Sequence, residues 1–305
     1  MPVTHAPASQ RVGLVLGAGG VTGQGFHAGV LWALHEAAGW DPRTAEVIVG
    51  TSAGSEVAAL LRAGLSAADL AARAMGEPLS PEGKALLAGV GPPLPIPPLS
   101  PALLGRPVAP EALRRALRSP LLARAGTTIA AAMPSGTISI EPLAAYLRPL
   151  HGDVWPSRAL WICATQLDEA RRAVFGRDAL PVTDVGTAVA ASCAAPGWFK
   201  PVSIDGARYL DGGAWSATNL DVLAGLGLDL VVVSAPLARV VRRGRLAVEA
   251  AKVRRTGTRV AVFAPTVADL RAMGLNALDV SRRGPATRQA HASVMRRCRR
   301  LRRRT

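Results

Sequence analysis

The segment Gly50-Thr51-Ser52-Ala53-Gly54 combines a serine with glycines two positions before it and two positions after it. It follows the apolar run 47–49 and precedes a helix-compatible stretch that we expect to begin at Ser55. Such glycines let a strand turn sharply into a helix, and the start of that helix directs partial positive charge at the exposed hydroxyl. The pattern predicts a nucleophile elbow with Ser52 as the nucleophile, although its spacing also fits a plain serine and glycine turn that caps a helix.

Few histidines are available to accept the proton of this serine. Downstream of Ser52 only His151 and His291 remain, the first after a helix pattern that contains proline and the second in an arginine-rich segment. We expect both at the solvated surface, which disfavours a triad in the order serine, acid, histidine.

An aspartate is the better candidate for the proton acceptor. Asp211 follows the run 207–210 and precedes Gly212 and Gly213, two residues that allow close approach of the backbone. Asp205-Gly206 has a simpler explanation, because an Asp-Gly pair between two short strands predicts a hairpin turn. The sequence therefore favours Asp211 as the base.

A glycine-rich loop, Gly17-Ala18-Gly19-Gly20-Val21-Thr22-Gly23, lies between the apolar run 12–16 and a pattern of helical periodicity. A dinucleotide-binding loop has the same placement, but Thr22 stands where its third glycine is expected, and no acidic residue ends a second strand about 20 residues further on. Bare backbone amides at the start of a helix bind any anion, including the oxyanion of an acyl-transfer transition state. The loop geometry serves both functions.

Short apolar runs separated by alanine- and leucine-rich segments define the expected architecture. We predict strands at 12–16, 47–49, 160–164, 173–175, 202–204, 207–210, 230–234 and 260–263. The alternation of strands and helices predicts an α/β fold with three layers, α/β/α, around a central, mostly parallel sheet.

The predicted organisation is one domain over 11–280, after a flexible N-terminus at 1–10 and before an arginine-rich tail at 281–305. Proline content rises and periodicity fades over about 77–137, which marks an insertion or lid. Within it, residues 85–105 are uncharged but contain six prolines, so they cannot form a membrane-spanning helix. This stretch fits a lid that admits acyl chains and equally a surface linker.

The net charge of the chain is +15, and residues 281–305 contain ten arginines and no acidic residue. The remainder is therefore only mildly basic. The arginine-rich tail could contact anionic phospholipid at a membrane surface, a nucleic acid or an acidic partner, and it could equally be a solvated end without a specific role. Nucleic acid is the least favoured of these partners.

Cysteine usage and the N-terminal sequence narrow the remaining possibilities. Cys163, Cys193 and Cys298 lack the spacing of metal ligands and of a disulfide framework, so we expect reduced packing residues. We expect neither a metal nor another cofactor. The first ten residues lack a basic region followed by an apolar stretch, so we expect no signal peptide and a cytoplasmic location, with membrane association as an option.

With the glycine-rich loop, the G-x-S-x-G segment and the D-G-G segment in this order, the chain resembles the patatin-like phospholipase family. The resemblance extends to LVLGAGGVTGQGFHAGVLWAL at 14–34, ASCAAPGWFKPVSIDGARYLDGG at 191–213 and SATNLD at 216–221. It implies a patatin-like fold and hydrolysis of acyl esters such as phospholipids, lysophospholipids or acylglycerols, without a metal.

The resemblance also implies the roles of particular residues. Ser52 matches the nucleophile and Asp211 the proton acceptor of a Ser–Asp dyad without histidine. The backbone amides of Ala18, Gly19 and Gly20 match the oxyanion loop.

Two positions depart from the family pattern. Ala18 stands at the first glycine of G-x-G-x-x-G, and Thr22 stands where many members carry arginine or lysine. Neither change removes a backbone donor, but Ala18 restricts φ and the missing cation removes one anchor of the loop. The oxyanion site is therefore less firmly defined than the nucleophile.

Two other functions are compatible with the sequence. A general carboxylesterase or thioesterase would act on other acyl esters or thioesters. A non-hydrolytic protein could keep the fold and use its basic tail to recruit a membrane or a nucleic acid. The intact pair of Ser52 and Asp211 favours an enzyme.

Overall fold

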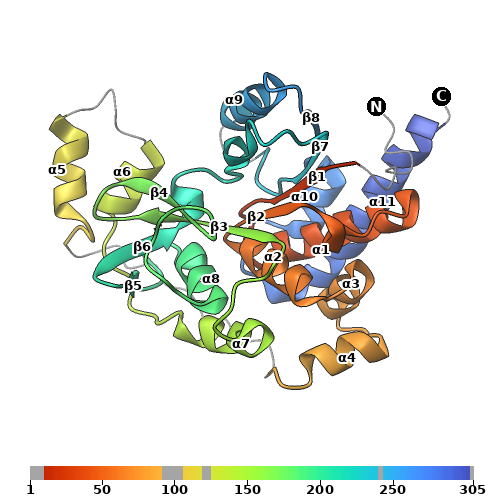
Figure 1. Ribbon diagram of the computed structural model, residues 1–305, viewed down its shortest axis with the longest axis horizontal. Helices are drawn as coiled ribbons and strands as arrows, with labels where there is room; N and C mark the ends of the chain where they lie inside the picture. The colour runs from red at the N-terminus through yellow and green to blue at the C-terminus, as the bar shows by residue number, and fades with distance from the viewer. Residues whose placement is uncertain (1–9, 91–105, 119–124, 240–242, 303–305) are drawn as a thin grey trace.

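A computed structural model describes residues 10–90, 106–118, 125–239 and 243–302 of the chain (Figure 1). These residues contain one sheet of eight strands. The strands are β1 (Val12–Leu16), β2 (Val47–Thr51), β3 (Ala159–Gln166), β4 (Arg171–Phe175), β5 (Val202–Ile204), β6 (Ala207–Asp211), β7 (Leu230–Ser234) and β8 (Arg259–Phe263). Each corresponds to a strand predicted from the sequence, and the bounds differ by at most two residues.

Helices connect and cover these strands. The α-helices are α1 (Gly20–Ala38), α2 (Ala53–Ala63), α3 (Ala67–Met75), α4 (Pro81–Leu87), α5 (Pro110–Arg118), α6 (Ala125–Ala132), α7 (Glu141–His151), α8 (Val185–Cys193), α9 (Arg243–Arg254), α10 (Val267–Met273) and α11 (Arg283–Arg302). Short 3-10 helices are η1 (Pro42–Thr44), η2 (Gly212–Ala214), η3 (Leu220–Leu223) and η4 (Val280–Arg282).

The strand order in the sheet is β5-β6-β3-β2-β1-β7-β8, and β4 also pairs with β3. Neighbours among β3, β2, β1, β7 and β8 are parallel, whereas the pairs β3/β4, β3/β6 and β5/β6 are antiparallel. Strands β1 and β2 are buried along their whole length, and their valine-rich sequences suit strands that are covered on both faces.

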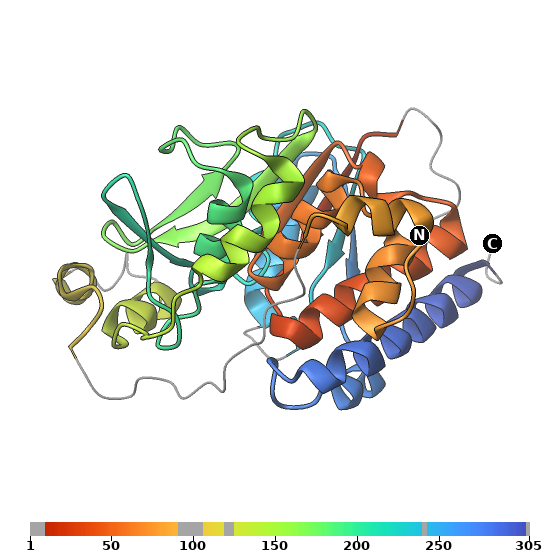
Figure 2. The ribbon, with the colours of Figure 1, turned by 90° about the horizontal axis from the view of Figure 1, so that it is seen from below.

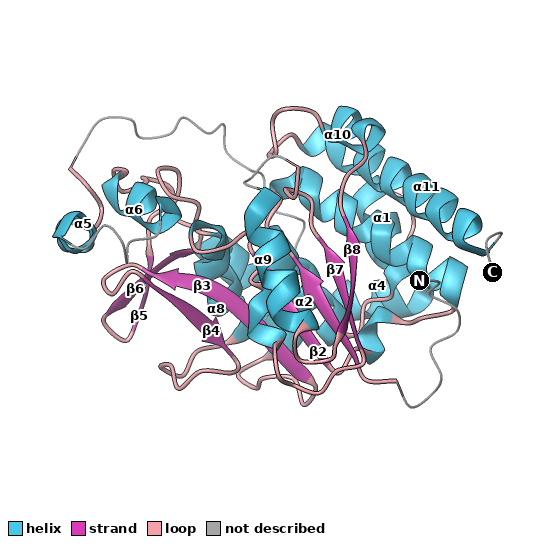
Figure 3. Cartoon of the chain, turned by 90° about the horizontal axis from the view of Figure 1, so that it is seen from above, coloured by secondary structure: helices cyan, strands magenta, loops and turns pink. Residues whose placement is uncertain are grey.

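Helices lie on both faces of this sheet (Figures 2 and 3). On one face, Leu31 of α1 and Leu60 of α2 belong to the same apolar cluster as Ile48 of β2. On the other face, Val253 of α9 belongs to a cluster with Val49, the next residue of that strand. Successive strand residues point to opposite faces, so the two clusters are separate cores. The predicted three-layer α/β/α fold with a mostly parallel sheet is confirmed.

The described part of the expected arginine-rich tail at 281–305 is a helix, α11, that packs against the rest of the domain. Helix α11 packs along α1 (Figure 2), and its Ala286, Ala290 and Val294 are buried. A Cβ atom at Gly25 or Gly29 of α1 would overlap the backbone of α11, so the two helices are in close contact. Ala286, Ala290 and Val294 therefore lie on the packed face of α11.

Some predictions fall on segments outside the described residues. Residues 1–9 and 91–105 are among these segments, so the expected flexible N-terminus and most of the expected lid at 85–105 are not described. The described part of 77–137 forms α4, α5 and α6 and adds no strand to the sheet. None of the described helices is long and apolar enough to cross a membrane.

Candidate active site

Ser52 lies at the turn between β2 and α2. Its backbone has φ 53° and ψ −127°, and a positive φ is unfavourable for a residue with a Cβ atom. A Cβ atom at Gly50 would collide with the backbone of α2, and one at Gly54 would overlap the carbonyl oxygen of Leu16. Glycines are therefore required on both sides of the serine. Helix α2 begins at Ala53, two residues earlier than predicted.

Strand β3 brings Asp211 to this turn. Strand β2 runs parallel to β3 and ends with Thr51 opposite Cys163. Strand β6 runs antiparallel to β3 and ends with Asp211 opposite Ala164, the next residue of β3. The carboxyl ends of β2 and β6 therefore meet at adjacent positions on one strand. The Ser52 side chain lies close enough to the Asp211 carboxyl group to affect its pKa.

The Asp211 carboxyl group is buried, with only 9% of the residue exposed. Its Oδ1 accepts a hydrogen bond of 2.7 Å from the amide of Gly213. Burial raises the pKa of Asp211 from 3.8 to about 6, and the Ser52 side chain and the hydrogen bond from Gly213 act in the opposite direction. A carboxylate with this pKa is a stronger base than an ordinary aspartate and is still ionised at pH 7.

Two serines fix the backbone of the elbow. The amide of Ser52 donates to Oγ of Ser192 in α8 at 2.8 Å, and Ser192 donates in turn to the carbonyl of Cys163 at 2.7 Å. Oγ of Ser55 donates to the carbonyl of Ser52 at 2.6 Å. Sequence reasoning did not identify Ser192, although it lies in the segment 191–213 that carries the family resemblance.

The glycine-rich loop differs from the prediction at one position. The amide of Ala18 donates to the carbonyl of Ala217 at 2.7 Å, so in this structure it is not free to bind the expected oxyanion. The amides of Gly19 and Gly20 have no acceptor among the described residues. A Cβ atom at Gly19 would lie 2.7 Å from Cα of Gly23, so this part of the loop must consist of bare backbone.

The loop passes beside both sides of the candidate site. A Cβ atom at Gly54 would lie 2.8 Å from the carbonyl oxygen of Gly17, and one at Gly213 would lie 3.4 Å from Cβ of Ala18. The loop is thus in contact with the elbow and with the turn that follows Asp211. The amides of Gly19 and Gly20 can therefore donate hydrogen bonds to an anion at the start of α1.

A buried histidine holds the start of this loop. Nε2 of His27 donates to the carbonyl of Gly17 at 2.8 Å, and Nδ1 accepts from Oγ of Ser234 at 2.8 Å. Burial lowers the pKa of His27 to about 4, so the ring is neutral at pH 7. Both ring nitrogens are engaged, so His27 positions the loop. Sequence reasoning missed it because it searched only downstream of the serine.

The two downstream histidines have structural partners elsewhere. Nε2 of His151 donates to the carbonyl of Ala59 at 3.0 Å. His291 lies 2.8 Å from Glu36 and stacks on Trp32 with ring centroids 3.8 Å apart. Both are half-buried rather than solvated, which corrects the expectation, and neither has a hydrogen bond to Ser52 among the described residues.

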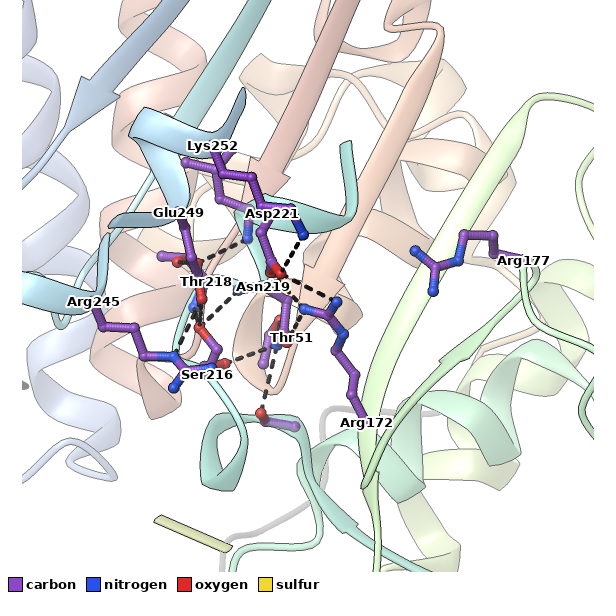
Figure 4. Close-up of polar contacts among 12 residues, drawn as sticks. Thr51, Arg172, Arg177, Ser216, Thr218, Asn219, Asp221, Arg245, Glu249 and Lys252 are labelled. Atoms are coloured by element: carbon purple, nitrogen blue, oxygen red, sulfur yellow. Dashed lines mark hydrogen bonds and ion pairs between the residues drawn. The ribbon is translucent and has the colours of Figure 1, made fainter. Parts of the chain in front are cut away.

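A buried carboxylate organises the loop that follows the Asp-Gly-Gly turn (Figure 4). Glu249 of α9 is 4% exposed and accepts hydrogen bonds from Oγ of Ser216 at 2.6 Å, Oγ1 of Thr218 at 2.7 Å and the amide of Leu220 at 3.1 Å. Arg245 lies 3.2 Å from the same carboxylate. Four donors thus offset the cost of burying this charge.

Asn219 links that loop to the candidate site (Figure 4). It is fully buried at φ 50°, and its Nδ2 donates to Oγ1 of Thr51 at 3.1 Å and to the carbonyl of Ser216 at 2.8 Å. Thr51 directly precedes the nucleophile candidate. Hydrogen bonds thus connect Glu249 to the elbow through Ser216 and Asn219. No local sequence pattern identifies Glu249, because its partners lie on another segment of the chain.

The described residues offer no obvious metal site. Within them, no three His, Cys, Asp or Glu side chains lie close enough together to hold an ion.

The fold and the site define an α/β protein with a serine in a nucleophile elbow beside a buried aspartate. A comparison with protein families matches residues 14–224 to the family Patatin-like phospholipase. The match covers more than half of the chain and includes the elbow and Asp211. The chain therefore belongs to the patatin-like phospholipase family, which places it among the lipid ester hydrolases.

Two solved structures are similar to this chain. VipD from Legionella pneumophila matches with a TM-score of 0.46 and 15% identity, over 96% of this chain and 67% of that one. The type III effector protein ExoU matches with a TM-score of 0.35 and 16% identity, over 96% of this chain and 54% of that one. This chain thus corresponds to about two thirds and about half of their lengths. No curated protein matches its sequence.

Proposed function

We propose that the protein hydrolyses acyl esters of phospholipids or lysophospholipids, with Ser52 as the nucleophile and Asp211 as the base. One observation carries the proposal. Because β3 pairs with the ends of β2 and β6 at adjacent positions, a strained serine and a buried carboxylate meet at one point. Membership of the patatin-like phospholipase family supports a lipid ester as the substrate.

The proposed reaction is a double displacement. Ser52 attacks the ester carbonyl while Asp211 takes its proton, and the alcohol leaves with that proton to give an acyl-enzyme. A water molecule then attacks the acyl-enzyme while Asp211 takes its proton, and Oγ of Ser52 leaves with that proton as the fatty acid is released. The amides of Gly19 and Gly20 stabilise the oxyanion of both steps, assisted by the partial positive charge at the start of α1.

The proposal is tested with single substitutions and a matched control. We expect Ser52→Ala and Asp211→Asn each to lower kcat/KM on phospholipid and lysophospholipid vesicles by about 10³-fold or more, because each removes a group that acts in both steps. Asp205→Asn makes the same chemical change as Asp211→Asn. Asp205 lies in the hairpin turn between β5 and β6, so the Asp205→Asn protein should keep its activity.

A fluorophosphonate probe gives an independent readout, since it should label the wild-type protein and not the Ser52→Ala protein. Full hydrolytic activity of Ser52→Ala would contradict the proposal. Hydrolysis of short-chain esters or thioesters without any activity on lipid vesicles would favour a general carboxylesterase or thioesterase.

A further inference from the structure

Five helices each contribute one side chain to a polar cluster near the elbow. Nε2 of Gln24 donates to Glu56 at 2.5 Å, and Arg73 forms an ion pair with Glu56 at 3.5 Å. Arg73 also donates to the hydroxyl of Tyr146 at 2.8 Å. Arg283 lies close enough to Arg73, Glu56 and Tyr146 for their charges to affect its pKa. These residues belong to α1, α2, α3, α7 and α11, so the cluster exists only in the folded domain.

The cluster lies about one helical turn from the reacting groups. Glu56 follows Ser52 by four residues at the start of α2, and Gln24 follows Gly20 by four residues at the start of α1. Ser52 is the N-cap of α2 and Gly20 is the first residue of α1, so Glu56 and Gln24 lie about one turn from these two helix starts. A group bound at the cluster is therefore a neighbour of the nucleophile and of the free loop amides.

The backbone of Arg283 is fixed between two of these helices. A Cβ atom at Gly25 of α1 would overlap the carbonyl oxygen of Arg283, and one at Gly284 would lie 3.4 Å from Cα of Met75 in α3. Arg283 thus begins α11 at the place where this helix packs against α1 and α3.

The charges of the cluster do not balance. Arg73 and Arg283 supply two guanidinium groups, and Glu56 supplies the one carboxylate among the five side chains. Arg73 is bonded to Glu56 and Tyr146, whereas Nε of Arg283 is buried without an acceptor among the described residues. Burial lowers the pKa of Arg283, and the charge of Arg73 lowers it further. The folded protein therefore holds this cation at a cost in stability.

We infer that Arg283, together with Arg73, binds the phosphate group of a phospholipid substrate while Ser52 attacks its acyl ester; this inference rests on the proposed function. A guanidinium group matches a phosphate because it can donate two parallel hydrogen bonds to two of its oxygens. In a glycerophospholipid, the phosphate and the acyl ester are attached to the same three-carbon unit. Phosphate bound at Arg283 would keep the ester close to Ser52, and a neutral acylglycerol would lack this contact.

The kinetic test compares two substrates that differ only in the phosphate, a monoacylglycerol 3-phosphate and the monoacylglycerol with the same acyl chain. We expect Arg283→Gln to lower kcat/KM tenfold or more on the phosphate-bearing substrate, mainly through KM, and to leave the neutral substrate unchanged. Arg288→Gln is the matched control, because Arg288 lies on α11 with its side chain exposed and paired with Glu77. An equal effect of Arg283→Gln on both substrates, or no effect, would overturn the inference.

A stability measurement separates binding from a structural role. Because the fold disfavours the charge of Arg283, Arg283→Gln should unfold at the same temperature as the wild type or at a higher one. A markedly lower Tm together with equal loss on both substrates would show a structural role instead. Arg283→Lys keeps the charge without the planar fork, so it should restore only part of the selectivity.

A binding measurement does not depend on hydrolysis. Calorimetric titration of the full-length Ser52→Ala protein with glycerol 3-phosphate should show binding that Arg283→Gln removes and Arg288→Gln retains. This result would support the phosphate site even if no ester were hydrolysed. The same protein is also titrated with inorganic phosphate. Equal affinity for inorganic phosphate and glycerol 3-phosphate would indicate a site for free phosphate and overturn the lipid assignment. Ester hydrolysis without any binding would reject the site and leave the proposed function standing.

Discussion

The raised pKa of Asp211 predicts opposite effects of pH on activity and on stability. As a base, Asp211 must be ionised, so kcat/KM on a soluble ester should rise about tenfold per pH unit below pH 6 and level off above it. For stability, an acid with a raised pKa in the folded state binds its proton more tightly there than in the unfolded chain. Ionised Asp211 therefore destabilises the fold.

The size of this effect follows from the pKa values. Below pH 3.8 Asp211 is protonated in the folded protein and in the unfolded chain, so it does not affect stability. The loss of stability grows as the pH rises from 3.8 to about 6. A pKa raised from 3.8 to about 6 corresponds to about 3 kcal/mol of lost stability at pH 8. Asp211→Asn removes the ionisation and can keep the hydrogen bond from the amide of Gly213.

Urea unfolding of the wild type and of Asp211→Asn at pH 4, 6 and 8 measures the difference. We expect little difference at pH 4 and an advantage of about 2–3 kcal/mol for the variant at pH 8, while its activity is lost at every pH. The other carboxylates titrate in both proteins and cancel. A stability difference that does not change with pH, or a wild-type activity that is flat between pH 5 and 8, would refute the reasoning.

Three further predictions concern the surroundings of the site. Asn219→Ala should lower stability by about 2–4 kcal/mol in urea unfolding, because it places alanine at φ 50° and leaves buried groups without a donor. Gly29→Ala should lower the Tm by several degrees, since its Cβ atom would overlap the carbonyl oxygen of Thr287, whereas Gly89→Ala, which meets nothing within 4 Å, should not. If α11 contacts anionic membranes, replacing Arg299 and Arg300 with Gln should weaken binding to anionic vesicles by about 1 kcal/mol each at low salt, measured by sedimentation.

The sheet and the elbow could be predicted because their signals are local. Runs such as Val12–Leu16 are apolar and are followed by glycine. Such a run is typical of a strand in a sheet that is covered on both faces. The elbow also has a local signal, the glycines on both sides of Ser52. Gly50 is required by its contact with Ser55, and Gly54 by its contact with Leu16 of the neighbouring strand β1. Asp211 was identified from the glycines that follow it and from the family resemblance.

The terminal helix could not be predicted from composition. Its arginines suggested a solvated end, yet Ala286, Ala290 and Val294 recur every four residues and form a buried stripe. The matching stripe on α1 contains Gly25 and Gly29, also four residues apart. Each stripe was present in the sequence, but the pairing of the two depends on tertiary structure. For the same reason the bond from Ala18 to Ala217 had no local signal.

The geometry of the site is largely a property of β3. Its residues Cys163 and Ala164 pair with the ends of β2 and β6, and the carbonyl of Cys163 also receives Ser192, which in turn receives the amide of Ser52. A Cβ atom at Gly212 would overlap that same carbonyl oxygen, so the turn after Asp211 is pressed against β3 as well. A slip of β3 by one residue would therefore displace the serine and the aspartate together. The contacts that hold Ser52 and Asp211 at this point therefore come from β2, β3, β6 and α8.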